Sequence, residues 1–236
     1  MAERIRIQKA IANAGLMSRR AAEEAMTEGR VLLNGRSVVL GDRVDPNVDV
    51  LTLDGAPVSL NTEVETHLLY KPVGVISTAH DPQGRRTVVD LIRSQRRLYP
   101  VGRLDTDSEG LILVSNDGEL TNRVTHPRYG ITKKYLVEVR GSPNRAALRK
   151  LTDGVQLDDG PARAENVRLV DSHGERSLVE LVMVEGRNRE VRRMFDVLGF
   201  EVTRLVRTAI GPITDPSLKP GKSRRLTPVE IQNLLS

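Results

Sequence analysis

The sequence predicts an α+β protein in which a largely antiparallel mixed sheet with flanking helices follows a small domain of helices and a hairpin. Short apolar segments recur along residues 67–236, and single helical patterns separate them irregularly, which favours this class over a regular alternation of strands and helices. Two helical patterns and an Asn-Gly turn lie within residues 1–54. Residues 55–66 contain Gly, Pro, Ser and Asn with little periodicity, which predicts a linker.

The small domain is predicted from local signals. Apolar residues recur at helical spacing over 7–14 before a glycine, which predicts a first helix. Ser18 can cap a second helix over 18–28, because its side chain can accept a hydrogen bond from a free backbone amide. Residues 31–39 are predicted to form a hairpin, since Asn34-Gly35 supplies the positive dihedral angles of a tight turn.

In the larger domain, strands are predicted where apolar residues alternate or form short runs, and helices where they recur every three or four positions. The predicted elements are, in order, a strand at 67–70 with a turn at 71–74 and a return strand at 75–77, a polar loop at 80–86, a short helix at 87–93, a buried strand at 111–114, a helix through 124, a half-buried strand at 131–139, a helix opened by Ser142-Pro143, a buried strand at 178–184, a helix before Gly199, a strand at 200–207, a basic loop at 219–225 and a final helix capped by Thr227.

Composition excludes several classes of protein. The chain has 236 residues, 39% of them hydrophobic, which is enough for a core. It has no cysteine, so disulfides and thiolate metal sites are impossible, and its four histidines are too scattered to predict a metal site. No apolar run approaches the length of a membrane span, and the first residues lack the apolar core of a signal peptide. We therefore expect a cytoplasmic protein.

The net charge of +5 is compatible with a polyanionic partner, although many basic proteins bind none. The distribution of charge is more informative. Residues 1–22 carry five basic side chains and one acidic one, and residues 84–104 carry six arginines and one aspartate. Such clusters are typical of phosphate contacts. Aromatic residues make up only 3% of the chain, so we expect recognition of RNA shape and phosphates and not of stacked bases.

One loop concentrates acidic side chains ahead of an apolar strand. Asp105, Asp107 and Glu109 follow Arg103, which could hold a carboxylate through two hydrogen bonds, and Gly110 precedes the apolar run. On composition alone, a solvated acidic loop next to an arginine is the more common arrangement, since structural ion pairs also gather charges.

The order of residues in this loop resembles a known signature. Gly102-Arg103-Leu104-Asp105, then Gly110 to Leu113 and Asn116-Asp117-Gly118, is similar to the bacterial ribosomal RNA pseudouridine synthases of the small-subunit type and their large-subunit relatives. The resemblance implies the pseudouridine synthase fold and makes Asp105 the catalytic carboxylate. Asp107 and Glu109 occupy variable positions, for which no catalytic role is implied. Ser108 stands where many members carry threonine, which keeps the hydroxyl.

Two downstream segments extend the resemblance. Lys133-Lys134-Tyr135 matches a segment that places a tyrosine against the target base, although an isolated tyrosine of this kind more often packs in a core. Val191-Arg192 matches the last motif, in which the arginine pairs with the catalytic aspartate. Arg192 is therefore expected to contact Asp105. Glu190 departs from the glutamine common at this point. We expect the substrate pocket to include Arg103, Leu104 and Val191.

The N-terminal region carries a second resemblance. Ser18-Arg19-Arg20-Ala21-Ala22 and Gly29 to Gly35 are similar to the small RNA-binding domain shared by a ribosomal small-subunit protein and tyrosyl-tRNA synthetases, over residues 4 to about 51. On spacing alone, its arginines could equally be ordinary solvated side chains. The residues implied to form one RNA-binding face are Arg4, Lys9, Arg19, Arg20 and Arg36. Further candidates for RNA contacts are Lys71, in a Lys-Pro-Val-Gly turn where a lysine is usually only solvated, and Arg85 and Arg86 in the polar loop.

These resemblances imply an enzyme that isomerises a uridine of ribosomal RNA, with a leaning to the large subunit, and acts as a monomer on the RNA or on a precursor ribosomal particle. No metal or organic cofactor is expected, because the carboxylate and the base supply the chemistry. Residue types leave open whether Asp105 is a nucleophile or a base. One alternative is a non-catalytic RNA-binding ribosome assembly factor. Another is a glycosidase, which the scarcity of aromatic residues argues against.

Overall fold

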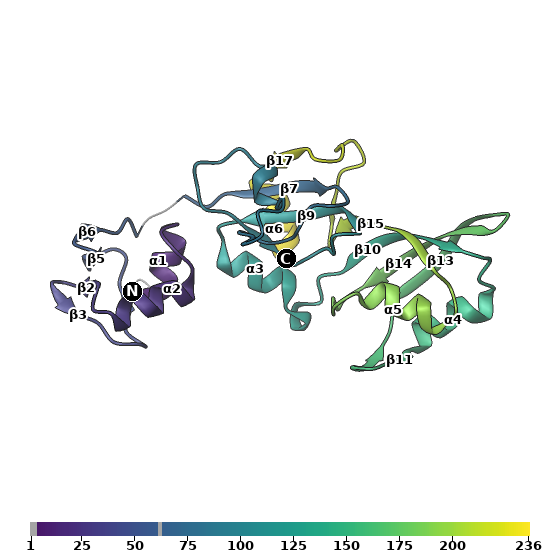
Figure 1. Ribbon diagram of the computed structural model, residues 1–236, viewed down its shortest axis with the longest axis horizontal. Helices are drawn as coiled ribbons and strands as arrows, with labels where there is room; N and C mark the ends of the chain where they lie inside the picture. Colours follow the sequence, from purple (N-terminus) through teal and green to yellow (C-terminus); the bar gives the residue numbers. More distant parts are fainter. Residues whose placement is uncertain (1–3, 61–62) are drawn as a thin grey trace. The chain divides into compact units, whose positions relative to one another are not determined.

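The computed structural model describes residues 4–60 and 63–236 and divides into two compact units (Figure 1). The smaller unit contains the chain up to Glu65 with Ser94–Leu98 and Asn116–Gly118, and the larger unit contains the remainder. Within the predicted linker, β6 (Ala56–Pro57) forms a strand that pairs with β5 (Leu51–Leu53). The predicted linker therefore begins too early, and residues 61–62 of it lie outside the described residues.

The smaller unit packs two helices with two small sheets. Its elements are β1 (Ile5–Arg6), α1 (Ile7–Asn13), α2 (Arg19–Thr27), β2 (Val31–Leu33), β3 (Arg36–Ser37) and β4 (Arg43–Val44), followed by β5 and β6. The Ser18 hydroxyl accepts a hydrogen bond of 3.1 Å from the Ala21 amide, which confirms the predicted cap of α2. Asn34 and Gly35 have φ values of 51° and 76°, which confirms the predicted turn between β2 and β3.

The core of the smaller unit follows from the helical spacing of its apolar residues. Ile7 and Ile11, one turn apart on α1, are fully buried, as is Ala22 on α2. They pack in one cluster with Val31 of β2 and Leu51 of β5. Burial of these side chains fixes the helices against the sheet.

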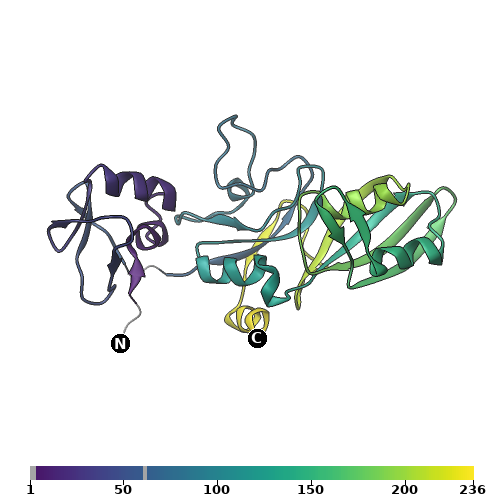
Figure 2. The ribbon, with the colours of Figure 1, turned by 90° about the horizontal axis from the view of Figure 1, so that it is seen from below.

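The larger unit is built on a nine-stranded sheet in the order β13-β14-β10-β15-β9-β7-β17, with β16 beside β15 and β8 beside β9. Figure 2 shows the ribbon turned by 90° from the view of Figure 1. The strands are β7 (Thr66–Lys71), β8 (Tyr99–Val101), β9 (Glu109–Ser115), β10 (Lys133–Arg140), β13 (Asn166–His173), β14 (Arg176–Met183), β15 (Val202–Ile210), β16 (Ile213–Thr214) and β17 (Ser223–Arg225). Its named strands pair antiparallel except for β15 with β9. The predicted α+β class is confirmed.

Helices and one further hairpin complete the described chain. These elements are α3 (Gly118–Thr125), α4 (Arg145–Asp153), β11 (Val155–Leu157), β12 (Gly160–Ala162), α5 (Glu190–Val197) and α6 (Pro228–Leu235). Thr227 and Glu230 form the reciprocal cap at the start of α6. Within the described residues, no helix combines the length and the apolar character needed to cross a lipid bilayer.

Four predicted elements differ from the structure. The predicted basic loop at 219–225 ends in the strand β17, which pairs with β7. Asn144, and not Ser142-Pro143, caps α4, because its side chain accepts a hydrogen bond of 2.8 Å from the Ala147 amide. The predicted return strand at 75–77 is reduced to a single bridge between Ile76 and Thr87. The predicted helix at 87–93 is only a 3₁₀ turn at Val89–Leu91.

The one parallel contact in the larger sheet, between β9 and β15, is short and unusually close. It pairs Val206 with Glu109 and Arg207 with Gly110. A Cβ atom on Gly110 would lie 2.3 Å from the carbonyl oxygen of Arg207, and the φ of Gly110 is 108°. Only glycine allows the two backbones to approach in this way. The contact fixes the loop that precedes β9 against the middle of the sheet.

Candidate active site

The loop between β8 and β9 holds Asp105 in a tight turn. The Ser108 amide donates a hydrogen bond of 3.1 Å to the carbonyl of Asp105. The Ser77 hydroxyl accepts a hydrogen bond of 3.1 Å from the Leu104 amide and donates one of 2.7 Å to the Leu104 carbonyl. Hydrogen bonds therefore fix the backbone on both sides of Asp105, at Leu104 and in the turn that ends at Ser108. This fixes the position from which the Asp105 side chain projects.

Lys71 holds this loop through hydrogen bonds to backbone carbonyls. Its side chain is fully buried, and its Nζ donates hydrogen bonds of 2.7 Å to the Ser108 carbonyl and 3.1 Å to the Pro72 carbonyl. Burial lowers the pKa of Lys71 to about 8, although the neighbouring carboxylates of the loop act in the opposite direction. The prediction that Lys71 contacts an RNA phosphate is wrong, because its ammonium group faces the loop and not solvent.

Arg207 of β15 braces the same loop at both ends. Its side chain is buried, and its Nε donates a hydrogen bond of 2.6 Å to the carbonyl of Leu111. One of its terminal nitrogens also contacts the carbonyl of Arg103 at 3.5 Å. Sequence reasoning missed the roles of Arg207 and Lys71. The available signal was a charged residue placed inside an apolar strand, where an unpaired charge is costly.

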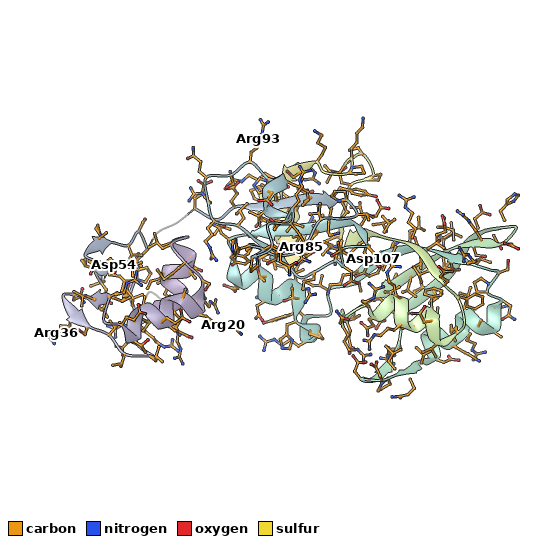
Figure 3. The ribbon with its side chains drawn as sticks, viewed as in Figure 1. Arg20, Arg36, Asp54, Arg85, Arg93 and Asp107 are labelled. Carbon is orange, nitrogen blue, oxygen red and sulfur yellow. The ribbon has the colours of Figure 1, made fainter. Side chains whose placement is uncertain are left out.

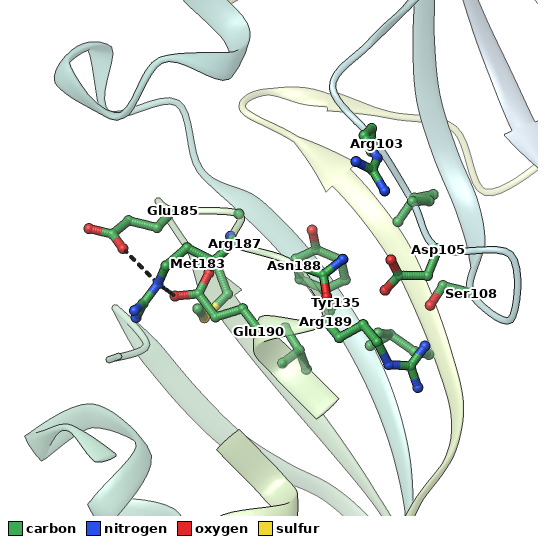
Figure 4. Close-up of a pocket in the computed structure, with 14 residues that line it drawn as sticks. Arg103, Asp105, Ser108, Tyr135, Met183, Glu185, Arg187, Asn188, Arg189 and Glu190 are labelled. Atoms are coloured by element: carbon green, nitrogen blue, oxygen red, sulfur yellow. Dashed lines mark hydrogen bonds and ion pairs between the residues drawn. The ribbon is translucent and has the colours of Figure 1, made fainter. Parts of the chain in front are cut away.

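Asp105 and Tyr135 line one cavity of about 140 Å³ (Figure 4). Tyr135 reaches it from β10, where the alternating pattern turns its largely buried side chain inward as predicted. The predicted pocket residues Arg103, Leu104 and Val191 also line the cavity. The remaining lining residues are Ser108, Met183, Leu205 and the segment from Glu185 to Glu190. The cavity therefore joins the acidic loop to residues from β10, β14, β15 and the start of α5.

A second, wider hollow of about 690 Å³ shares part of this wall. It includes Arg103, Leu104, Asp105 and Arg189, together with residues of the turn after β7. Asp105 thus borders both hollows.

Arg192 does not pair with Asp105. Its terminal nitrogens donate hydrogen bonds of 2.9 Å to the carbonyls of Asp107 and Val202, and its Nε lies 3.4 Å from a carboxylate oxygen of Asp107. Arg189, at a φ of 47°, donates to both carboxylate oxygens of Asp107 at 3.1 and 3.0 Å. The predicted ion pair between Arg192 and Asp105 is therefore wrong for this structure. The turn directs Asp107, and not Asp105, toward α5.

Glu190, which departs from the glutamine common in the resemblance, is neutralised locally. Its carboxylate is buried and accepts hydrogen bonds from the Arg187 amide at 3.0 Å and from the Arg187 Nε at 2.9 Å. This pairing fixes the segment that carries Asn188 and Arg189 to the cavity. The extra negative charge is thus held by an arginine beside the site.

The candidate RNA-binding residues of the smaller unit are mostly exposed. Arg4, Arg19, Arg20 and Arg36 are exposed, and Lys9 is half-buried. Arg20 on α2 and Arg36 at the start of β3 lie at opposite ends of the unit (Figure 3). A surface that includes both would span the whole unit.

Two of the predicted arginines lie in the polar loop of the larger unit. Arg85 pairs with Asp81, to which it donates hydrogen bonds of 3.0 and 2.8 Å, and Arg86 is exposed. Arg96, in the same basic stretch of the sequence but in the smaller unit, pairs with Glu63 at 2.8 Å. The positive charge of this stretch is therefore partly compensated. No group of three or more His, Asp or Glu side chains within the described ranges could hold a metal ion.

Comparisons with known proteins identify the family of this chain. Residues 65–196 match the family model for RNA pseudouridylate synthase, and residues 5–50 match that for the S4 domain. A Bacillus subtilis protein named ribosomal large subunit pseudouridine synthase B is 44% identical over 97% of this chain and 95% of its own. A Mycobacterium tuberculosis protein named as an uncharacterized RNA pseudouridine synthase is 45% identical over 98% of this chain and 92% of its own. A crystal structure of a pseudouridylate synthase superposes with a TM-score of 0.69 at 29% identity, covering 98% of this chain and 99% of that one.

Residues 65–196, which include the acidic loop and Tyr135, match the family model, so this part of the larger unit is a pseudouridine synthase domain. The chain belongs to the RNA pseudouridylate synthase family, and an S4 domain precedes its synthase domain. It is an isomerase, as the resemblance predicted.

Arg192→Lys is expected to slow catalysis about 100-fold and to change the dissociation constant for RNA less than about threefold. Arg192 reaches the carbonyls of Asp107 and Val202 with two separate terminal nitrogens, and a lysine offers only one nitrogen in place of this planar fork. The loop would therefore lose part of its anchor to α5, and small misplacements of this kind are costly. Single-turnover rates and filter binding would measure both quantities. Arg168→Lys, at an exposed pair on β13, is the matched control. Weaker RNA binding at an unchanged rate would contradict this positioning role.

Lys71→Met is expected to change how the unfolding free energy of the protein depends on pH. Because the pKa of Lys71 is about 8 in the folded protein and 10.5 is the ordinary value, the unfolded chain binds more protons between these limits. The unfolding free energy of the wild type relative to Lys71→Met should therefore rise from about pH 8 to about pH 10.5. Urea unfolding at several pH values would measure it, with the exposed Lys219→Met as control. A difference that falls or stays flat over this range would contradict the burial of a charged Lys71.

Proposed function

We propose that this protein converts a uridine of large-subunit ribosomal RNA to pseudouridine, with Asp105 as the catalytic carboxylate and Tyr135 against the target base. The observation that supports this most directly is that the two side chains line the same cavity. The choice of the large subunit rests on the named Bacillus subtilis relative, which matches nearly the whole chain.

The reaction requires the target nucleoside to leave its stack and enter the cavity, which costs a few kcal/mol. The C1′–N1 bond then breaks, and its electron pair stays with uracil. The detached base turns and forms a bond from C5 to C1′. N1 gains a proton, and C5 loses its hydrogen as a proton, so atoms and charge balance without an added reactant.

The side chains have separate roles in this scheme. Asp105 acts on the sugar, either as a nucleophile at C1′ or as a base, and the residue types do not distinguish these roles. The ring of Tyr135 packs on the uracil, and its hydroxyl assists removal of the C5 proton. Arg192 is a positioning residue, because it holds the loop through Asp107 and not through the reacting atoms.

RNA binding is assigned to the S4 domain and to exposed arginines such as Arg19, Arg20 and Arg86. Their guanidinium groups would contact phosphates and repay the cost of extruding the nucleoside. We assign the substrate as free ribosomal RNA or a precursor ribosomal particle, bound by a monomer in the cytoplasm.

Transcripts of each ribosomal RNA with tritium at C5 of uridine would test the proposal. Incubation with the protein should release tritium from the large-subunit transcript and not from the small-subunit one. Mapping pseudouridines in a strain that lacks the gene should then show one missing site in the large subunit. Release from the small-subunit transcript alone would overturn the choice of subunit. Absence of release from every transcript and precursor particle would favour a non-catalytic assembly factor.

A further inference from the structure

Ser108 carries a hydroxyl that the fold of the protein does not use. Its side chain is 1% exposed, and its Oγ is buried without a hydrogen-bond partner among the described residues. A buried hydroxyl without a partner is unfavourable, and such groups in native proteins commonly have a functional reason. Ser108 lines the cavity that Asp105 and Tyr135 share.

The Asp105 carboxylate, in turn, lacks a hydrogen-bond donor. No hydrogen bond or ion pair joins its oxygens to another side chain or amide of the described residues, since Arg189 and Arg192 are engaged with Asp107. In the free protein, solvent can serve the carboxylate, because Asp105 is only half-buried. A nucleoside that fills the cavity removes that solvent and leaves the carboxylate without a donor.

The two groups leave one tight turn from its two ends. The hydrogen bond of 3.1 Å from the Ser108 amide to the Asp105 carbonyl closes this turn, which brings the first and fourth residues near each other. Figure 4 shows the Ser108 hydroxyl and the Asp105 carboxylate side by side at the cavity wall. Rotation about one side-chain bond is enough to redirect a serine hydroxyl.

We infer that Ser108 is a positioning residue that donates a hydrogen bond to the Asp105 carboxylate once the target nucleoside closes the cavity. The bond holds the carboxylate oxygens in the orientation that acts on the sugar and replaces the solvent that the nucleoside displaces. It forms in the RNA complex and contributes nothing to the stability of the free protein. The inference rests on the proposed function, because it assumes that Asp105 acts on an RNA nucleoside in this cavity.

Three substitutions at one position separate the hydroxyl from the volume of the side chain. Ser108→Ala and Ser108→Val remove the hydroxyl, and Ser108→Thr keeps it. We expect single-turnover tritium release from labelled large-subunit transcript to be about tenfold slower in the Ala and Val variants and within about threefold of wild type in the Thr variant. The dissociation constant for the transcript should stay within about twofold in all three, because the bond serves the reacting carboxylate and not RNA binding.

The pH–rate profile adds a reading that a purely structural serine would not change. A hydrogen bond to a carboxylate favours its ionised form, so the acid limb of the profile should move to higher pH in Ser108→Ala and return in Ser108→Thr. Lys71 below the turn and Asp107, Glu109, Arg103 and Arg189 around it are the same in each variant. The shift therefore reports the hydroxyl alone.

Each outcome bears on the inference. The melting temperature of Ser108→Ala should equal or exceed that of the wild type, and a clear fall would show a structural hydroxyl and overturn the inference. A wild-type rate in Ser108→Ala, or weaker RNA binding at an unchanged rate, would overturn it while leaving the proposed function intact. A wild-type protein that releases no tritium from any transcript would overturn the proposed function, and the inference with it.

Discussion

Asp105→Asn should abolish tritium release, with a rate at least about 10⁴-fold below wild type, while RNA binding stays within about twofold. The amide has the shape of the carboxylate but can act neither as a nucleophile at the sugar nor as a base. Asp105 makes no side-chain ion pair in the described structure, since the neighbouring arginines hold Asp107, so its replacement should leave the loop in place. Single-turnover tritium release and filter binding with labelled transcript would measure the two effects.

Asp171→Asn is a suitable control for this experiment. Asp171 lies on the exposed face of β13, and its carboxylate accepts a hydrogen bond from the Ser172 amide, which asparagine can also accept. The control should release tritium at the wild-type rate. If Asp105→Asn retained substantial activity, the assignment of the catalytic carboxylate would be wrong, and another acidic group of the loop would have to be sought.

Gly110→Ala should lower the unfolding free energy by about 4 kcal/mol or more and reduce the yield of folded protein. The new methyl group would lie 2.3 Å from the Arg207 carbonyl oxygen and 2.6 Å from its amide nitrogen, both backbone atoms that cannot turn away. The strands β9 and β15 would have to separate, which would break their only parallel pairing and move the catalytic loop. Urea unfolding followed by circular dichroism would measure the loss.

Gly174→Ala distinguishes the clash from the cost of an unfavourable dihedral angle. Gly174, in the turn between β13 and β14, has a φ of 57°, and a Cβ there would meet no atom within 4 Å. We expect this variant to lose only about 1 kcal/mol, from backbone strain. Equal losses in the two variants would show that the close approach of β9 and β15 is not what requires glycine at position 110.

The sequence by itself predicted those elements whose cause is local. Ser18 caps α2, Asn34-Gly35 turns the first hairpin, and Thr227 opens α6, because each acts on backbone groups within a few residues. The alternating strand β10 was also predicted, since burial of one face leaves a period of two in the sequence. β13 left no such trace, because nearly all of its residues are exposed.

The features of the site also fall into those that the sequence predicted and those that only the tertiary structure decided. The order of residues around Asp105, with Tyr135 downstream, identified the class of enzyme and the two side chains that share the cavity. Only the tertiary structure decided that Arg192 holds Asp107 and that Lys71 lies buried beneath the turn. Such partners come from strands and helices far apart in the chain. Asp105 and Asp107 are two residues apart, and the conformation of the turn decides which carboxylate meets the arginine. Local hydrogen bonds are encoded within a few residues, whereas the pairing of buried charges depends on how the whole sheet packs.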